Sequence, residues 1–346
     1  MSELRQDPAS KRWVIIAKER AKRPSDFVRK ETPPPVPDYS PDCPFCPGNE
    51  AMTPDEVFAY HDAATGREQG PWRVRVVPNK FAALGPDGDI AVEHPEIFTT
   101  MNGIGHHDVI IESPLHNQTL GTMNCEQCEE VVLAYTERFA QLADQPHVRY
   151  VSIFRNHGAT AGTSLVHPHS QVIATPVVPA HARQEIEEAR RHYDDRVRCV
   201  YCDILETELR LEQRVILDTA HFVTIAPFAP RWPFEMKILP KRHNSSFADI
   251  NHVEVRGLAE TLSGTLGLLH RAAGNPDYNL TLHTAPLHDS CEDYYHWHIE
   301  IYPRLATQAG FELGTGIFIN TVFPEDTAAF LRDAQLAQPE ACPTPA

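Results

Sequence analysis

The sequence has no long apolar run and few basic residues relative to acidic ones. No stretch approaches the roughly 20 consecutive apolar residues that a membrane-spanning helix needs, so no membrane association is expected. The first residues, Met1–Arg12, are polar and charged and lack the apolar core of a secretory signal. Lys and Arg number 31 against 47 Asp and Glu, which gives a net charge of −16. This balance disfavours a general nucleic-acid binder, whose surface would have to be basic.

The composition is that of a folded globular protein. With 42% hydrophobic and 23% charged residues, the chain is not disordered throughout, and its 346 residues suggest about two domains. The Pro-rich segment Glu31–Pro47 is predicted to be an extended connector. The tail 335–346, which contains Cys342, is predicted to be disordered. Because an export signal is lacking, a cytoplasmic location is expected.

Cysteine and histidine are frequent, with 8 and 19 residues. Six of the cysteines form Cys-x-x-Cys pairs, and these pairs are Cys43/Cys46, Cys125/Cys128 and Cys199/Cys202. In a reducing compartment such pairs are better candidates for metal ligands than for disulfides. The Cys125/Cys128 pair has no histidine partner at a repeated position, so packing within a helix is the favoured interpretation for it.

Two halves of the sequence resemble each other. HDVIIESPLHN (107–117) and FEMKILPKRHN (234–244) both end in His-Asn, and each is followed at nearly equal spacing by a Tyr and then a His-x-His pair. Each half also begins with a Cys pair, so the shared order indicates a duplicated unit. Consecutive strands with one helix predict an antiparallel sheet of the α+β class in each half. The predicted units are 1–180 and 181–334.

Short β-branched segments bounded by turn residues predict the strands, and apolar residues at helical spacing predict the helices. The predicted strands are 72–78, 107–112, 150–155, 172–175, 222–227, 234–239, 278–283 and 296–302. The predicted helices are 127–142, capped by Asn124, 182–197 and 252–273. His106 and His107 are interpreted only as strand residues near a sheet edge.

The first chemical constellation is a candidate metal site. Two thiolates and two imidazoles close a tetrahedron around Zn²⁺, and four protein ligands leave no open position, so such a site is structural. The first half offers Cys43, Cys46, His116 and His167. By internal symmetry the second half offers Cys199, Cys202, His243 and His296.

The second constellation is NHGATAGTSLVHPHSQ (156–171). His167, His169 and Gln171 alternate and would share one face of a strand, and a Gly-rich turn before them could present backbone N–H groups to a phosphate. A neutral imidazole is a good nucleophile towards phosphorus when an acceptor holds its other nitrogen.

These motifs resemble the nucleotidylyltransferase branch of the histidine-triad superfamily. His-x-His-x-Gln, the upstream Asn-x-Gly and the duplicated half are similar to the galactose-1-phosphate uridylyltransferase family of galactose metabolism, including its ADP-glucose phosphorylase-like members. The resemblance extends from about Leu4 to Ala334 and implies two tandem histidine-triad-like units. The GTG-x-x-IN run (314–320) looks more like the ADP-glucose phosphorylase-like subgroup.

The resemblance also implies roles for individual residues. His169 would attack the α-phosphorus of a nucleoside-diphosphate hexose, and the His167 carbonyl would orient it. Gln171 would hydrogen-bond the phosphoryl oxygens, and a second phosphate-bearing acceptor, a sugar 1-phosphate or phosphate, would then take the nucleotide. Gln cannot act as a general acid, which favours transfer over hydrolysis. The further substrate contacts implied are Arg20, Arg23, Asn79, Asn156, Gly162, Ser164 and Glu312.

In the second half, Glu300 stands where Gln171 stands in the first, and its carboxylate would repel a phosphate. This half is therefore predicted to be non-catalytic. For its metal, the resemblance offers an alternative to the Cys-containing set, and this alternative consists of Glu185, His283, His296 and His298. The Cys-containing set is favoured, and zinc over iron, because thiolates bind zinc strongly.

The favoured function is transfer from UDP-glucose to a hexose 1-phosphate by a uridylyltransferase. One alternative is an adenylyltransferase that cleaves ADP-glucose, or a dinucleoside polyphosphate, with phosphate. An alternative of another class is a zinc-stapled nucleotide-binding module without catalysis. A homodimer is expected by analogy with the family.

Overall fold

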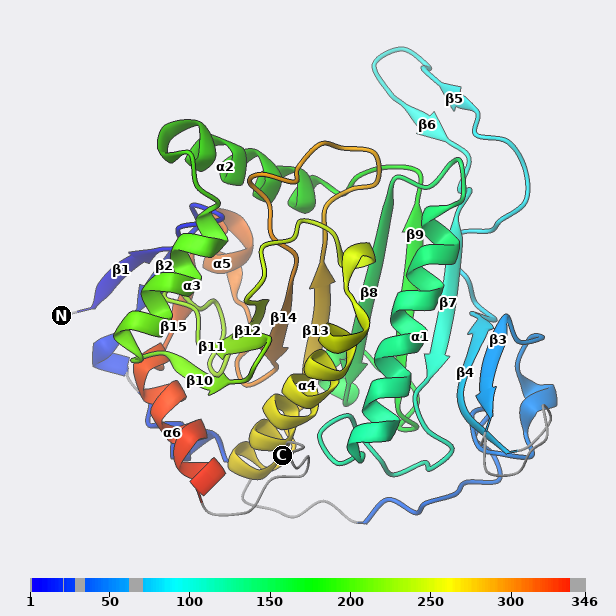
Figure 1. The fold of residues 1–346 in the computed structure, drawn as a ribbon, viewed down its shortest axis with the longest axis horizontal. Helices are drawn as coiled ribbons and strands as arrows, with labels where there is room; N and C mark the ends of the chain where they lie inside the picture. Colours follow the sequence, from blue (N-terminus) through cyan, green and yellow to red (C-terminus); the bar gives the residue numbers. More distant parts are fainter. Residues whose placement is uncertain (1, 21, 29–34, 62–70, 337–346) are drawn as a thin grey trace.

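A computed structural model describes residues 2–20, 22–28, 35–61 and 71–336 (Figure 1). It contains one large sheet whose neighbouring strands are all antiparallel, in the order β10-β11-β12-β14-β13-β8-β9-β7-β4-β3. Its strands, in chain order, are β3 (Phe58–His61), β4 (Trp72–Pro78), β7 (His106–Ile111), β8 (Tyr150–His157), β9 (His169–Thr175), β10 (Val215–Asp218), β11 (Phe222–Ile225), β12 (Met236–Pro240), β13 (Tyr278–His283) and β14 (His298–Pro303).

The duplication predicted from the sequence is visible in this strand order. Reading outwards from the centre, β8, β9, β7, β4 and β3 of the first half mirror β13, β14, β12, β11 and β10 of the second. The two half-sheets join edge to edge, because β8 pairs with β13 and places Arg155 opposite Leu280. The α+β class and the antiparallel sheets are confirmed, and the continuity of the two sheets is a further finding.

Two long helices cover one face of the sheet (Figure 1). The side chain of Asn124 caps α1 by accepting a hydrogen bond from the Gln127 N–H, as predicted. The α4 helix starts with a capping box between Asn251 and Glu254 and ends at Gly274 in the left-handed conformation. The α-helices are α1 (Cys125–Ala143), α2 (Ala180–Arg196), α3 (Val200–Leu211), α4 (His252–Ala273), α5 (Gly310–Thr315) and α6 (Pro324–Leu336).

The alternation of side chains along the strands separates two layers. Val76, Ile110 and Val172 face α1 and α4 and belong to the main core. Their neighbours Val109 and Ile111 face the opposite side, where they pack with Phe45, Trp72 and the first Cys pair, so the candidate site lies on the face away from the two long helices.

Two smaller sheets flank the large one. The first has the order β1-β2-β15 and lies beside the second half, whereas the β5–β6 hairpin projects from the first half (Figure 1). Their strands are β1 (Glu3–Gln6), β2 (Trp13–Ile16), β15 (Phe318–Asn320), β5 (Val92–Glu93) and β6 (Thr100–Met101). None of the helices in the described ranges is long and apolar enough to cross a membrane.

The predicted helices match α1, α2 and α4 within two residues at each end. The sequence did not predict α3, which begins within the third Cys-x-x-Cys motif, the helices α5 and α6, or the short strands β1, β2, β3, β5, β6, β10 and β15. The α6 helix continues two residues into the tail that was predicted to be disordered. The rest of that tail, with Cys342, lies outside the described residues, as does part of the Pro-rich connector.

Candidate active site and metal clusters

The His-x-His-x-Gln motif lies where β9 begins. His169 and Gln171 project from the same face of the strand, as its alternation requires, and both line a cavity of about 410 Å³. Asn79 and Ser164 line the same cavity. The structure thus brings together four of the residues that the sequence analysis assigned to substrate.

His169 is held in a single orientation. Its Nδ1 lies 2.7 Å from the carbonyl oxygen of His167, and because a carbonyl can only accept, Nδ1 carries the proton. In the neutral ring Nε2 is then unprotonated. Burial lowers the pKa of His169, and the hydrogen bond to the His167 carbonyl opposes this shift. Phe45 packs edge-on against the ring, with 5.4 Å between the centroids.

Gln171 has two polar neighbours on the cavity side. Its Oε1 lies 2.8 Å from Nε2 of His107 and 3.4 Å from Nδ2 of Asn79. From the sequence, His107 is expected only on a strand near a sheet edge, but its strand β7 lies between β9 and β4 inside the sheet. Its place in the site follows from the pairing of β7 with β9, in which His107 lies on the same face as Val109, the residue opposite Gln171. A pattern read along one strand could not reveal this contact between strands.

A Gly-rich turn leads into the motif. Gly158 has a φ of 83°, and a Cβ there would meet the Asp277 carboxylate at 2.1 Å, so glycine is required. The same carboxylate accepts hydrogen bonds from the backbone N–H and the hydroxyl of Thr160, which fixes the turn. Gly162 has a φ of 91° and open space around it. Asn156, on β8, accepts a hydrogen bond from Nδ2 of Asn279.

A buried charge network supports β9 from behind. Ser170 points to the face opposite His169 and donates to Glu112, which also forms an ion pair with Arg155 at 3.0 Å. Tyr135 of α1 lies 2.6 Å from the Ser170 hydroxyl. The network ties the strand that carries the motif to its neighbours and to α1.

The first Cys-His set converges as predicted. Cys43, Cys46, His116 and His167 offer ligand atoms that lie within 4.8 Å of one another, and all four residues are buried. The Nε2 of His167 lies 2.7 Å from the Ser113 carbonyl, so Nε2 carries the proton and the unprotonated Nδ1 faces the Cys46 sulfur at 3.6 Å. Such a carbonyl partner is typical of histidines that bind metal.

The second set repeats this arrangement. Cys199, Cys202, His243 and His296 also converge within 4.8 Å. His296 directs Nε2 to the Pro240 carbonyl at 3.0 Å, and its Nδ1 lies 3.7 Å from the Cys202 sulfur. The donor chemistry of both clusters, two thiols and two imidazoles, suits a metal ion.

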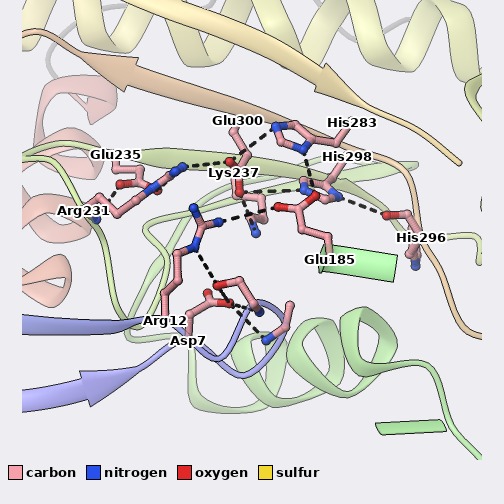
Figure 2. Close-up of polar contacts among 12 residues, drawn as sticks. Asp7, Arg12, Glu185, Arg231, Glu235, Lys237, His283, His296, His298 and Glu300 are labelled. Atoms are coloured by element: carbon pink, nitrogen blue, oxygen red, sulfur yellow. Dashed lines mark hydrogen bonds and ion pairs between the residues drawn. The ribbon is translucent and has the colours of Figure 1, made fainter. Parts of the chain in front are cut away.

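A third cluster lies on the second-half counterpart of the active site (Figure 2). Glu185, His283, His298 and Glu300 offer ligand atoms within 4.8 Å of one another. The alternative set from the sequence analysis shares three of these residues, but His296 lies with the cysteines and Glu300 takes its place. The two sets that were treated as alternatives are therefore separate groups of side chains.

Cationic side chains surround the third cluster. Glu300 forms ion pairs with Lys237 at 2.9 Å and with Arg231 at 3.0 Å, and Arg12 lies 3.6 Å from Glu185 (Figure 2). Burial raises the pKa of Glu300, but Lys237 and the other cations outweigh it and hold that pKa well below its usual range. Glu185 is buried although it lies in a strongly charged stretch of α2.

Five of the expected substrate contacts do not line the cavity beside His169. Two of them, Asn156 on β8 and Gly162 in the Gly-rich turn, lie in the segment that leads to the motif. Arg20 and Arg23 belong to the N-terminal segment that packs beside β15, and Glu312 accepts a hydrogen bond from the Ala309 N–H at the start of α5. None of them lines the cavity beside His169 among the residues that the structure describes. Cys128 is buried in the main core, in agreement with a packing role.

The fold is a duplicated α+β unit, and in its first half an oriented, buried histidine lines a cavity. This combination is typical of nucleotidyltransferases of the histidine-triad type. Family models for galactose-1-phosphate uridyl transferase match residues 1–179, as the N-terminal domain, and 185–322, as the C-terminal domain. The chain belongs to the galactose-1-phosphate uridylyltransferase family.

Its relatives include enzymes with two different names. It is 38% identical over 338 residues to an ADP-glucose phosphorylase of Arabidopsis thaliana, covering 96% of this chain and 93% of the relative. It is 29% identical over 345 residues to a galactose-1-phosphate uridylyltransferase of Thermotoga maritima, covering 97% and 99%. A crystal structure of the Arabidopsis thaliana phosphorylase with bound ADP-glucose has a TM-score of 0.81 at 34% identity and covers 96% and 98% of the two chains.

Proposed function

We propose that this protein transfers a nucleoside monophosphate from a nucleoside-diphosphate hexose to a phosphate-bearing acceptor through a covalent intermediate on His169. The observation that carries this proposal is the hydrogen bond from His169 Nδ1 to the His167 carbonyl, which leaves Nε2 unprotonated on a residue that lines the cavity. A histidine held in this way is an activated nucleophile.

The reaction proceeds in two displacements. Nε2 of His169 forms a bond to the α-phosphorus of the donor, the bond from that phosphorus to the bridging oxygen breaks, and sugar 1-phosphate leaves. An oxygen of the acceptor phosphate then attacks the same phosphorus and displaces His169. Gln171 lies beside His169 on the cavity and supplies hydrogen-bond donors to the charge that develops on the phosphoryl oxygens. Ser164 lines the cavity for the outer phosphate.

We infer that ADP-glucose is the better candidate donor, with phosphate as acceptor. The support is the 38% identity to a phosphorylase of ADP-glucose, against 29% to a uridylyltransferase, together with the GTG-x-x-IN run. UDP-glucose with a hexose 1-phosphate is the second candidate, favoured by the matching family models. Placing ADP-glucose before UDP-glucose reverses the order of donors that the sequence alone favoured.

Zinc is the proposed occupant of both Cys-His clusters. Cys43, Cys46, His116 and His167 would hold one ion, and Cys199, Cys202, His243 and His296 would hold the other. Four protein ligands supply a structural cross-link rather than catalytic chemistry. In the first half this cross-link would fix His167, whose carbonyl orients His169. Thiols kept available for metal are consistent with the expected cytoplasmic location.

The substrate contacts expected for Arg20, Arg23 and Glu312 stay predictions. These residues lie with the β1-β2-β15 sheet and α5, at the end of the molecule away from β9 (Figure 1). Contact with a substrate on His169 would therefore need a second chain, which gives the expected homodimer a testable consequence.

The test is a comparison of donors. The protein is incubated with ADP-glucose or UDP-glucose, each alone, and its covalent label is identified by intact mass; phosphate or galactose 1-phosphate is then added to discharge the label. We expect an adenylyl label that phosphate removes. A uridylyl label discharged by galactose 1-phosphate would establish the second candidate. Tight reversible binding without any label would instead support the non-catalytic module.

A further inference from the structure

The proposed role of Gln171 depends on which end of its amide faces the cavity. The NH₂ group can donate to a phosphoryl oxygen, whereas the carbonyl oxygen would repel it. The two ends have nearly the same size, so the neighbouring residues must decide the orientation. The residues that contact Gln171 therefore bear directly on the proposed reaction.

The backbone fixes the tautomer of His107. The Ala83 N–H can only donate, and it lies 3.1 Å from Nδ1 of His107, so Nδ1 is the accepting nitrogen. In the neutral ring the proton is then on Nε2, which lies 2.8 Å from Gln171 Oε1. His107 therefore donates to the end of the Gln171 amide that contacts it, and that end must be the carbonyl oxygen.

Asn79 supports the same assignment independently. Its Oδ1 accepts a hydrogen bond from the Phe81 N–H at 2.9 Å, which leaves its NH₂ group on the other side, 3.4 Å from Gln171 Oε1. Nδ2 of Asn79 also lies 3.1 Å from Nε2 of His107, and because both nitrogens are donors here, Gln171 Oε1 is the acceptor that both of them face. No described residue accepts a hydrogen bond from the NH₂ group of Gln171.

We propose that His107 is a positioning residue that fixes the polarity of the Gln171 amide, so that its NH₂ group faces the reacting phosphate. The inference rests on the proposed function. Both backbone donors that set the relay, Phe81 and Ala83, belong to the loop after β4, and Asn79 and Phe81 of this loop line the cavity. The loop thus has two roles, because it forms one wall of the cavity and sets the orientation of the reacting amide.

The second half lacks this relay. Val109 lies opposite Gln171 in the first half, and Lys237 lies opposite Glu300 in the second, so the position of His107 corresponds to Glu235. Glu235 is paired with Arg231 and accepts a hydrogen bond from the Trp232 N–H. A carboxylate such as Glu300 has two equivalent oxygens and needs no such orientation.

The experiment separates the two hydrogen bonds of His107. His107→Gln can place an amide NH₂ near the position of Nε2, whereas His107→Asn can place a carbonyl near the position of Nδ1 and cannot reach Gln171. His107→Phe removes both bonds at similar size. His106→Phe is the matched control, because His106 stacks on His147 with 5.9 Å between the ring centroids and is no part of the relay. The readouts are the rate of label formation from ADP-glucose or UDP-glucose, whichever labels the wild type, and the dissociation constant of that donor.

We expect His107→Phe and His107→Asn to slow labelling about tenfold with donor affinity changed less than about twofold. This is less than the 10²–10³ typical for loss of a stabilising donor, since the Gln171 NH₂ is misdirected rather than removed. His107→Gln should recover most of the rate. In a Gln171→Ala background, His107→Phe should lower the labelling rate by less than about twofold, because His107 then has no amide left to position.

Three results would overturn the inference: equal rates for His107→Phe and wild type, equal losses for the Gln and Asn variants, or full additivity with Gln171→Ala. A wild-type protein that forms no label at all would instead refute the proposed function, so the two failures are distinguishable.

Discussion

The two halves of this protein place the same pair of histidines at the start of equivalent strands and surround them differently. In both halves the carbonyl of the first histidine orients the second, at 2.7 Å for His169 and 3.0 Å for His298. The first half places an amide two residues further on, beside a cavity of about 410 Å³. The second half places Glu300 there, and charged side chains leave about 10 Å³ beside it (Figure 2).

The difference shows that one fold can hold the same oriented histidine in two different surroundings. Both halves repeat the Cys-His cluster and the hydrogen bond from the second histidine to the backbone carbonyl of the first. The second histidine ring is therefore oriented in the same way in each half. In the proposed reaction, access of a phosphate to that ring depends on the charge at the position of Gln171 or Glu300 and on open space beside the ring. Glu300 and Glu185 already occupy the second site with negative charge, and Lys237, Arg231 and Arg12 balance it.

The largest expected effect comes from making the first half resemble the second. Gln171→Glu puts a carboxylate where the phosphoryl oxygens develop charge, so it both removes a donor and adds repulsion. Loss of one such donor typically costs 10²–10³ in rate, and we expect about 10³ or more here. Single-turnover labelling measures it, with Gln171→Ala as the milder comparison. A Glu variant as fast as the Ala variant would show that charge at this position does not matter.

Removing one thiol from each metal cluster should separate the halves by activity. Cys46→Ser and Cys202→Ser should each lower the zinc content from two ions per chain to one, measured by elemental analysis. Only Cys46→Ser should slow labelling, by about 10- to 100-fold, because His167 is both a ligand candidate and the residue whose carbonyl orients His169. Equal slowing by both variants, or wild-type protein without metal, would contradict this assignment.

The charges of the second half should contribute to stability rather than to catalysis. Lys237→Met leaves the buried Glu300 with one cation fewer, and breaking a buried ion pair typically costs about 3–5 kcal/mol of unfolding free energy. Lys241→Met is the control, because its pair with Asp218 is part-exposed and should contribute less than about 1 kcal/mol. Denaturant unfolding compares them. Equal losses of unfolding free energy in the two variants would contradict a larger contribution from the buried ion pair.

The smallest expected effect is that of restoring the motif in the second half. Glu300→Gln recreates His-x-His-x-Gln there, yet we expect no label on His298 and less than about a twofold change on His169. The reason is that the space beside Glu300 is filled by neighbouring side chains. Peptide mapping of the labelled variant is the measurement, and modification of His298 would show that one carboxylate alone had silenced this half.

The sequence predicted the local features of the fold well and the contacts between strands poorly. Asn124 as a cap, the three long helices and both Cys-His clusters follow from spacing and residue type, which are local in the chain or repeated within it. The continuous sheet depends on the pairing of β8 with β13, and this edge-to-edge contact between the halves leaves no period in the sequence.

The same reason explains what the sequence missed in the site. His107 and Glu300 gain their roles from residues on neighbouring strands. The His107 side chain of β7 contacts Gln171 of β9, and Glu300 of β14 lies opposite Lys237 of β12. The two candidate metal sets of the second half both contained His296, so the sequence could not show that they are separate groups. The direction of its ring, towards the Cys202 sulfur, assigns it to one.

Intact-mass analysis after incubation with ADP-glucose or UDP-glucose tests the central claim most directly, with wild type, His169→Asn and His298→Asn side by side. We predict one nucleotidyl group on the wild type, one on His298→Asn and none on His169→Asn. A label that survives on His169→Asn, or disappears from His298→Asn while the protein remains folded, would contradict the assignment of the reaction to the first half.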